Sequence, residues 1–201
     1  MGVDGTVGRH PDRSPVWPQG TVGSISHCRH LAVAAAASDA ALLSLGVDVE
    51  EAADLAAELR TVLFTAKELA MVTGTDDDLL AGILFSLKES AFKCWYPTSR
   101  IFLDYTDVEV SPDPTSGYFI ADAVGPRRSS HPVPLVQGRF MIHFGHIFSA
   151  AWIEHPCLSR QGVAASAATP GQGFRRSTRS PALPCPSSGR RPTRAPTRRA
   201  S

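Results

Sequence analysis

Two acidic side chains, Asp48 and Glu50, have a spacing that could do chemistry. They alternate with Val47 and Val49 in a run typical of a β-strand, so both carboxylates should project from one face and both valines from the other. Residues two apart on a strand lie about 7 Å from each other. Carboxylates that close repel unless a cation lies between them, and Mg²⁺ prefers oxygen ligands of this kind. The alternative is an ordinary strand whose polar face meets solvent.

A helix expected over Leu79–Trp95 carries a third acid and a lysine. At about 100° per residue its apolar residues form one stripe, and Glu89 and Lys93 lie on the face away from that stripe. A glutamate and a lysine one turn apart are commonly a simple surface ion pair. Phe85 and Phe92 lie close to the same face, however, so we expect another part of the protein to cover the margin occupied by Glu89 and Lys93.

The segment from Trp17 to His27 reads WPQGTVGSISH and combines two glycines with hydroxyl groups and a histidine. Glycine permits a close approach of the backbone, and Ser24, Ser26 and His27 offer hydrogen-bond donors, which suits a phosphate-bearing ligand. The alternative is a turn with a satisfied histidine. Neither GxGxxG nor GxxxxGK[ST], the two common nucleotide-binding loops, occurs in the chain.

The groups described above must be positioned by strands and helices. The order and length of these expected elements predict an α+β fold, with an antiparallel sheet of about four to six strands and helices packed on it. We expect strands at Thr21–His27, Leu31–Ser38, Leu42–Glu50, Ile101–Val110, Tyr118–Ala123, Arg139–Phe144 and Ile147–Ile153. We expect helices at Glu51–Val62, after a Thr65–Glu68 capping box, and from Leu79 to an end before Pro97.

The net charge of +1 over 201 residues hides two segments of different character. Residues 154–201 hold nine arginines, no lysine and one acid, with much proline and serine. Such a composition cannot bury enough surface to offset the entropy of ordering, so we expect residues 154–201 to be disordered. A basic tail could also bind a polyanion, but without interleaved aromatics nucleic acid is not the expected partner.

Membrane insertion and export are not expected. The longest apolar run, near Leu31–Ala37, is far shorter than the roughly 20 residues that a membrane span needs. The first residues lack the basic and apolar regions of a secretory signal. The four cysteines form no CxxC pair, so we expect reduced thiols and a cytoplasmic protein rather than a disulfide framework or a structural zinc site.

The three candidate segments occur in a specific order, as WPxGxxGSxSH, then GxDxE, then FSxKESAFK. From about Arg9 to Ile153 this pattern resembles the 4′-phosphopantetheinyl transferase superfamily, most closely its enterobactin synthase component D-like branch. The resemblance implies a Mg²⁺-dependent enzyme that moves the phosphopantetheine arm of coenzyme A to a serine of an acyl or peptidyl carrier protein and releases 3′,5′-ADP. It also implies an enzyme of the holo-[acyl-carrier-protein] synthase type, with a role in siderophore, polyketide or nonribosomal peptide biosynthesis.

The resemblance also implies the roles of individual residues. Asp48, Glu50 and Glu89 would bind Mg²⁺, with Val49 adding a carbonyl or positioning a water. Glu89 would deprotonate the carrier serine, directly or through a water on the metal, and Lys93 would neutralise the pyrophosphate. The residues implied to contact coenzyme A are Arg9 and Arg13 at the nucleotide, Gly23 and Ser24 in the loop, Ser26 and His27 at the phosphates, and Leu103 beside the pantetheine path.

Three segments follow from this comparison. Residues 1–16 would be a remnant of a first lobe or a linker, 17–153 the transferase domain, and 154–201 the unrelated tail. We therefore expect a monomeric, N-terminally truncated transferase fold with an incomplete first lobe. Two other interpretations stay open: a catalytically inactive remnant of such an enzyme, and a module that binds polyanions through its tail.

Overall fold

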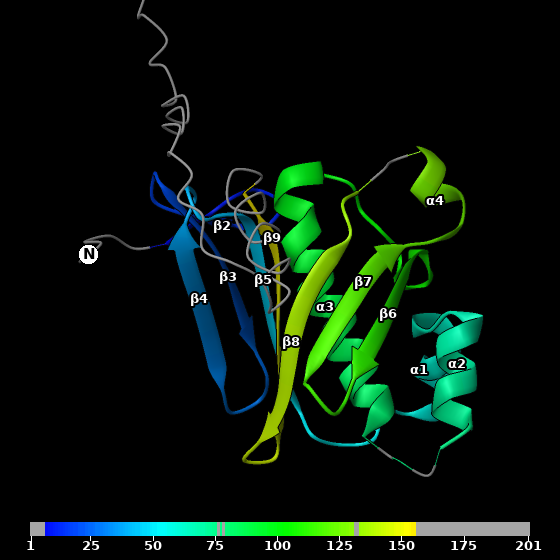
Figure 1. The fold of residues 1–201 in the computed structure, drawn as a ribbon. Coiled ribbons are helices and arrows are strands. Elements are labelled where there is room, and N and C mark those ends of the chain that lie inside the picture. The colour runs from blue at the N-terminus through cyan, green and yellow to red at the C-terminus, as the bar shows by residue number, and fades with distance from the viewer. Residues whose placement is uncertain (1–6, 76, 78, 131–132, 156–201) are drawn as a thin grey trace, which may run out of the picture.

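The computed structural model describes residues 7–155, apart from 76, 78, 131 and 132. Its elements are β1 (Gly8–Arg9), β2 (Pro15–Val16), β3 (Thr21–His27), β4 (Ala32–Ser38), β5 (Leu42–Glu51), α1 (Ala57–Leu63), α2 (Ala66–Thr73), α3 (Leu80–Ser99), η1 (Tyr105–Asp107), β6 (Val108–Asp113), β7 (Tyr118–Ala123), α4 (Gly125–Ser130), β8 (Val136–His143) and β9 (His146–Glu154). Five strands form an antiparallel sheet in the order β5-β9-β8-β7-β6, beside the hairpins β1–β2 and β3–β4 (Figure 1). The predicted α+β class, an antiparallel sheet with packed helices, is confirmed.

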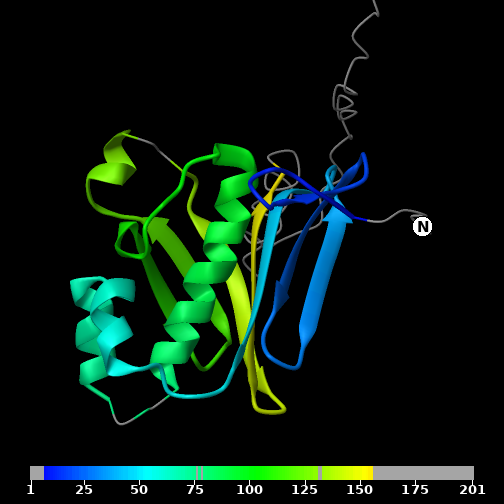
Figure 2. The ribbon, with the colours of Figure 1, turned by 180° about the vertical axis from the view of Figure 1, so that it is seen from behind.

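The long helix α3 crosses one face of the five-stranded sheet (Figure 2). Its predicted apolar stripe is buried, since Leu84, Leu87, Ala91 and Cys94 have no exposed surface. These side chains share one core with residues of the sheet, among them Val110, Phe119, Val136, Ile147 and Ala151. The sheet and α3 are therefore one packed unit that can hold polar groups in fixed positions.

Strand β5 lies close against α3. A Cβ atom on Gly46 would come within 2.0 Å of the carbonyl oxygen of Ser90, so only glycine fits at this crossing. Two residues earlier on β5, Ser44 donates a hydrogen bond of 2.5 Å to the carbonyl of Cys94 on α3. Because side chains alternate along a strand, Asp48 and Glu50 share the face of Ser44 and Gly46 and are directed toward the helix.

A buried ion pair connects α3 to α2. Lys88 Nζ lies 2.6 Å from a carboxylate oxygen of Glu68, and the two side chains are 1% and 0% exposed. Lys88 also donates to the carbonyls of Leu63, Tyr105 and Val108, at 2.9, 2.7 and 2.7 Å. One lysine thus holds the end of α1, the η1 turn and the start of β6 against α3.

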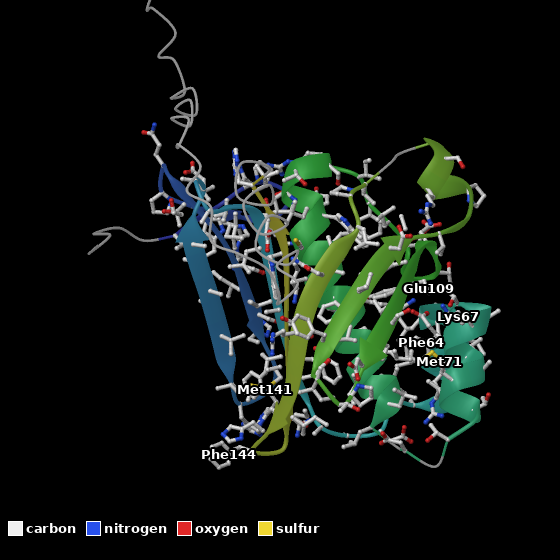
Figure 3. The ribbon with its side chains drawn as sticks, viewed as in Figure 1. Phe64, Lys67, Met71, Glu109, Met141 and Phe144 are labelled. Carbon is white, nitrogen blue, oxygen red and sulfur yellow. The ribbon has the colours of Figure 1, made fainter. Side chains whose placement is uncertain are left out.

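Glu68 has further partners of its own. It closes the predicted capping box with Thr65, which confirms that expectation, and it accepts a hydrogen bond of 2.8 Å from the backbone N–H of Val110. A second contact between α2 and β6, the exposed pair Lys67–Glu109, lies at the surface nearby (Figure 3). Helix α2 is therefore fixed to the sheet edge by one buried hydrogen bond and one exposed ion pair, and to α3 by the buried Lys88–Glu68 pair.

Two predicted helix boundaries were wrong. The helix expected at Glu51–Val62 begins at Ala57, because pairing of β5 with β9 continues to Glu51 opposite His146 and overrides the local helix propensity. Helix α3 continues beyond Pro97 to Ser99. Pro97 lacks the N–H that would bond the Lys93 carbonyl. The last turn keeps other hydrogen bonds, since the hydroxyls of Thr98 and Ser99 both donate to the Trp95 carbonyl, and Arg100 ends the helix in a left-handed conformation.

The strand expected over Ile101–Val110 begins only at Val108. Apolar residues at 101 and 103 imitate strand alternation, but the side chains of Asp104 and Asp107 cap the short turn η1 and interrupt any pairing. As a result Leu103 enters the core while Phe102 stays 66% exposed. The turn η1 matters for the site because it carries Tyr105.

The hairpin that joins β8 to β9 exposes large apolar side chains. Met141 is 56% and Phe144 88% exposed, and both lie at this end of the sheet (Figure 3).

Within residues 7–155, as far as they are described, no helix has the length and apolar character to cross a bilayer. Residues 156–201 of the predicted tail, and 1–6 of the predicted remnant, lie outside the described residues.

Candidate functional site

Acidic and basic side chains from α3 and β5 are in contact where the two elements pack, and this contact between Asp48, Glu89 and Lys93 is called the seam below. Lys93 Nζ lies 2.6 Å from Asp48 Oδ1 and 3.8 Å from Glu89 Oε2. The lysine therefore bridges a carboxylate of the strand and one of its own helix. This arrangement brings together Asp48, singled out by strand alternation, and the pair Glu89 and Lys93, singled out by helical phase.

A hydroxyl from β3 completes the contact. Ser26 Oγ donates to Asp48 Oδ1 at 2.8 Å and accepts from Lys93 Nζ at 3.0 Å. Asp48 is 2% exposed, and its second oxygen, Oδ2, is buried without a hydrogen-bond partner among the described residues. A buried carboxylate oxygen without a partner is costly, so this atom is available to a ligand.

Glu50, two residues along β5, is half-buried beside the same charges. Burial, followed by the negative charges of Asp48 and Glu89, raises its pKa from 4.5 to about 7, and Lys93 only partly opposes this. The protein thus concentrates more negative charge at the seam than one lysine neutralises.

These residues fit a hard divalent cation. They offer carboxylate oxygens, and one of these, Asp48 Oδ2, is buried without a hydrogen-bond partner among the described residues. The pKa of Glu50 is raised first by its burial and then by the negative charges of Asp48 and Glu89, which a bound cation would offset. As they stand, the histidine, cysteine, aspartate and glutamate side chains of the described residues nowhere form a group of three that could hold a metal ion. Asp48 and Glu89 instead share Lys93, so binding of Mg²⁺ by Asp48, Glu50 and Glu89 stays a prediction.

Tyr105, which the sequence did not reveal, contacts the site from η1. Its hydroxyl donates to Glu89 Oε1, and its ring centroid lies 5.9 Å from that of Phe85. Burial, together with the Glu89 carboxylate, raises the pKa of the Tyr105 phenol above its ordinary value of 10, which keeps it a donor. The sequence predicted that another part of the protein covers Glu89 and Lys93, and this is confirmed. Tyr105 covers Glu89, and Ser26 of β3 covers Lys93.

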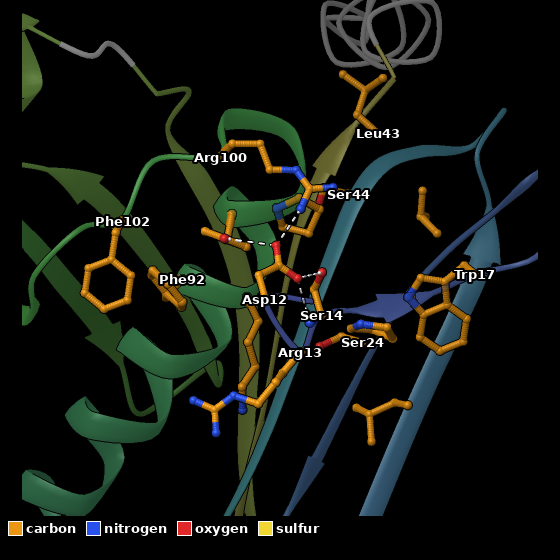
Figure 4. Close-up of a pocket in the computed structure, with 17 residues that line it drawn as sticks. Asp12, Arg13, Ser14, Trp17, Ser24, Leu43, Ser44, Phe92, Arg100 and Phe102 are labelled. Carbon is orange, nitrogen blue, oxygen red and sulfur yellow. Dashed lines mark hydrogen bonds and ion pairs between the residues drawn. The ribbon is translucent and has the colours of Figure 1, made fainter. Parts of the chain in front are cut away.

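A pocket of ≈ 450 Å³ opens next to this seam, between residues 12–17, β3 and the second half of α3 (Figure 4). Its lining combines cations, hydroxyls and aromatic rings, namely Arg13, Lys93, Arg100, Ser14, Ser24, Ser44, Trp17, Phe92, Tyr96 and Phe102. Gly23 allows the Trp17 ring to lie over β3, since a Cβ there would approach the ring to 2.7 Å. Cations beside aromatic faces suit an anionic ligand that also carries an aromatic or aliphatic part.

Asp12 fixes the loop that forms one wall of this pocket. Its carboxylate accepts from the Ser14 side chain at 2.6 Å, the Tyr96 hydroxyl at 3.1 Å and the Arg100 guanidinium at 3.0 Å (Figure 4). The hydrogen bonds from Ser14, with smaller contributions from Tyr96 and Arg100, lower the pKa of Asp12 to about 2. The loop with Arg13 is thereby attached to the end of α3. Tyr96 lies one turn from Lys93, so helical phase could have indicated it.

Four other predicted residues lie outside both groups. Arg9 is exposed on β1 and His27 is exposed at the end of β3, on the face opposite Ser26. The side chain of Val49 is fully buried, and Leu103 is 5% exposed within the core. None of the four lines the pocket, and their implied roles stay predictions.

Comparison with known proteins identifies the chain's relatives. Residues 44–137 match the model of the 4′-phosphopantetheinyl transferase superfamily, and residues 1–37 match that of the 4′-phosphopantetheinyl transferase N-terminal domain. The chain is 34% identical over 160 residues to the 4′-phosphopantetheinyl transferase Svp of Streptomyces mobaraensis, covering 78% of this chain and 62% of that protein. It is 28% identical to the transferase Npt of Nocardia iowensis, covering 72% and 70%, and 38% identical to enterobactin synthase component D of Escherichia coli K12, covering 46% of each.

Proposed function

Since the chain belongs to the 4′-phosphopantetheinyl transferase superfamily, we propose that it transfers the 4′-phosphopantetheine group of coenzyme A to a serine of an acyl or peptidyl carrier protein. The chain spans 62% of the length of the Svp transferase, so activity, substrates and partners are all part of the proposal. The observation that supports it most is that Lys93 belongs both to the carboxylate cluster and to the lining of the adjacent pocket. A single cation thus connects a metal-binding type of donor set with a space for an anionic ligand.

The pocket would bind coenzyme A. Arg13, Lys93 and Arg100 provide positive charge for its phosphates, and Trp17, Phe92 and Tyr96 provide ring surfaces for the adenine or the pantetheine arm. Ser24 adds a hydroxyl at the edge of β3. Asp12 keeps the Arg13 loop in position through its contact with Arg100.

The transfer is a displacement at phosphorus. Glu89 would accept the proton of the carrier serine, the serine oxygen would form the new bond to the phosphorus that carries pantetheine, and the bond to 3′,5′-ADP would break. Asp48, Glu50 and Glu89 would hold Mg²⁺, which supplies positive charge for the pyrophosphate when bound. Lys93 would offset charge that develops on the leaving 3′,5′-ADP, and alignment of the two substrates supplies much of the acceleration. No serine or cysteine of this chain acts as nucleophile.

Mass spectrometry of an apo carrier protein tests the proposal. After incubation with the chain, coenzyme A and Mg²⁺, the carrier should gain the mass of one phosphopantetheine group. Glu89→Gln and Asp48→Asn should slow this gain strongly, whereas Lys67→Gln, at the exposed pair with Glu109, should not. If several carrier proteins gain no such mass, and coenzyme A fails to bind in isothermal titration, the proposed function is wrong.

A further inference from the structure

The two carboxylate oxygens of Glu89 meet different partners. Oε1 accepts the hydrogen bond from the Tyr105 hydroxyl, while Oε2 is directed toward Lys93 at 3.8 Å. A glutamate at this half-exposed place on α3 would otherwise have several rotamers available. The hydrogen bond from Tyr105 to Oε1 accompanies the rotamer in which Oε2 is directed toward Lys93.

Tyr105 is itself held at both ends. Its carbonyl accepts a hydrogen bond of 2.7 Å from Lys88 Nζ, and its ring lies against Phe85. Two consecutive residues of α3 thus contact Tyr105, since Lys88 donates to its backbone carbonyl and Glu89 accepts from its hydroxyl. The η1 turn is closed by the hydrogen bond of 3.1 Å from the Asp104 N–H to the Asp107 carboxylate. A donor anchored in this way can define the position of another group.

We propose that Tyr105 is a positioning residue for Glu89, whose hydroxyl fixes one carboxylate oxygen so that the other is presented to the Asp48–Lys93 seam. This inference rests on the proposed function, because it assigns Glu89 to metal binding and proton transfer. Tyr105 neither touches the reacting atoms nor binds the metal. It acts in the way that hydrogen-bond partners of metal ligands do, by orienting the ligand.

Tyr105→Phe is the decisive variant, since it removes one oxygen and keeps the ring against Phe85. Isothermal titration with Mg²⁺ alone, and with Mn²⁺ alone, should give roughly 10- to 100-fold weaker binding than the unchanged chain. In the transfer assay at saturating Mg²⁺, kcat should fall while KM for coenzyme A stays nearly constant, because the lining of the pocket is unchanged. The melting temperature should change little.

Two controls separate positioning from a general loss of structure. Tyr118→Phe removes the same atom from a partly exposed tyrosine of β7 and should leave metal binding and transfer unchanged. In a Glu89→Gln background, Tyr105→Phe should cause no additional loss of metal binding. The proposal is overturned if Tyr105→Phe binds the metal like the unchanged chain, or if it weakens binding equally in the Glu89→Gln background. Weaker metal binding in Tyr105→Phe, with no transfer by the unchanged chain, would support the positioning role and refute the transferase.

Discussion

Replacing Lys88 by methionine should destabilise the fold more than almost any other change of one polar side chain. The Lys88–Glu68 pair is 1% and 0% exposed, so the remaining carboxylate would be buried without its cation. Removing one member of a buried ion pair costs about 3–5 kcal/mol, a large share of the roughly 5–15 kcal/mol that stabilises a domain. The carbonyls of Leu63, Tyr105 and Val108 would lose the same donor.

A double-mutant cycle isolates the pair from its other contacts. Glu68→Met should also be strongly destabilising, because the N–H groups of Thr65 and Val110 lose their acceptor, at about 1–3 kcal/mol for each unsatisfied group. In the double variant Lys88→Met/Glu68→Met no unpaired charge remains buried. Its loss should therefore be clearly smaller than the two single losses added together.

Urea unfolding followed by tryptophan fluorescence measures these free energies, since Trp95 is 1% exposed and donates to the Pro134 carbonyl. Lys67→Met removes the cation of the exposed pair with Glu109 and serves as the matched control, with little expected effect. A loss below about 1 kcal/mol for Lys88→Met, or additive losses in the double variant, would refute the reasoning, because either result means that the buried charge is compensated in some other way.

Three further expectations follow from individual residues. The pKa of Glu50 is raised from 4.5 to about 7, so in EDTA the contribution of this carboxyl to stability is present below pH 4.5 and is lost as pH rises through 7. The melting temperature should therefore fall more between pH 5 and 8 in the unchanged chain than in Glu50→Gln. Parallel plots of melting temperature against pH for the two proteins would contradict this. Gly46→Ala would bring a Cβ within 2.0 Å of the Ser90 carbonyl, so circular dichroism should detect a lowered melting temperature or loss of folded protein; an unchanged melting temperature would count against close packing of β5 on α3. Burial raises the pKa of Cys94 to about 12, so iodoacetamide at pH 8 should modify the half-buried Cys28 but not Cys94 until urea is added, as peptide mass spectrometry would detect; early labelling of Cys94 would contradict its burial.

Local periodicity was enough to predict part of the site. Alternation along β5 put Asp48 and Glu50 on one face, and helical phase put Glu89 and Lys93 on one margin of α3, where the structure has them. Both patterns follow from backbone geometry and need no knowledge of distant parts of the chain. The orientation of the acidic face toward α3, rather than toward solvent, did need the fold.

Contacts between distant segments had no such signal. Tyr105 reaches Glu89 from a turn 16 residues away, and Asp12 reaches Arg100 across 88 residues. A lysine such as Lys88 is expected at the surface, and its burial depends on Glu68 in another helix. Their positions result from tertiary packing, which hydrophobic periodicity within one segment does not encode.

The register of β5 against β9 limits where this chain can gain or lose residues. Asp48 pairs with Ser149, whose hydroxyl donates to the Ser86 carbonyl on α3, so strand pairing and helix packing agree in a single register. One residue inserted or deleted within 44–50 would turn Asp48 to the opposite face and direct a valine at Lys93. The turn between β6 and β7 carries no group of the site, so length variation among related sequences should accumulate there and be absent from β5.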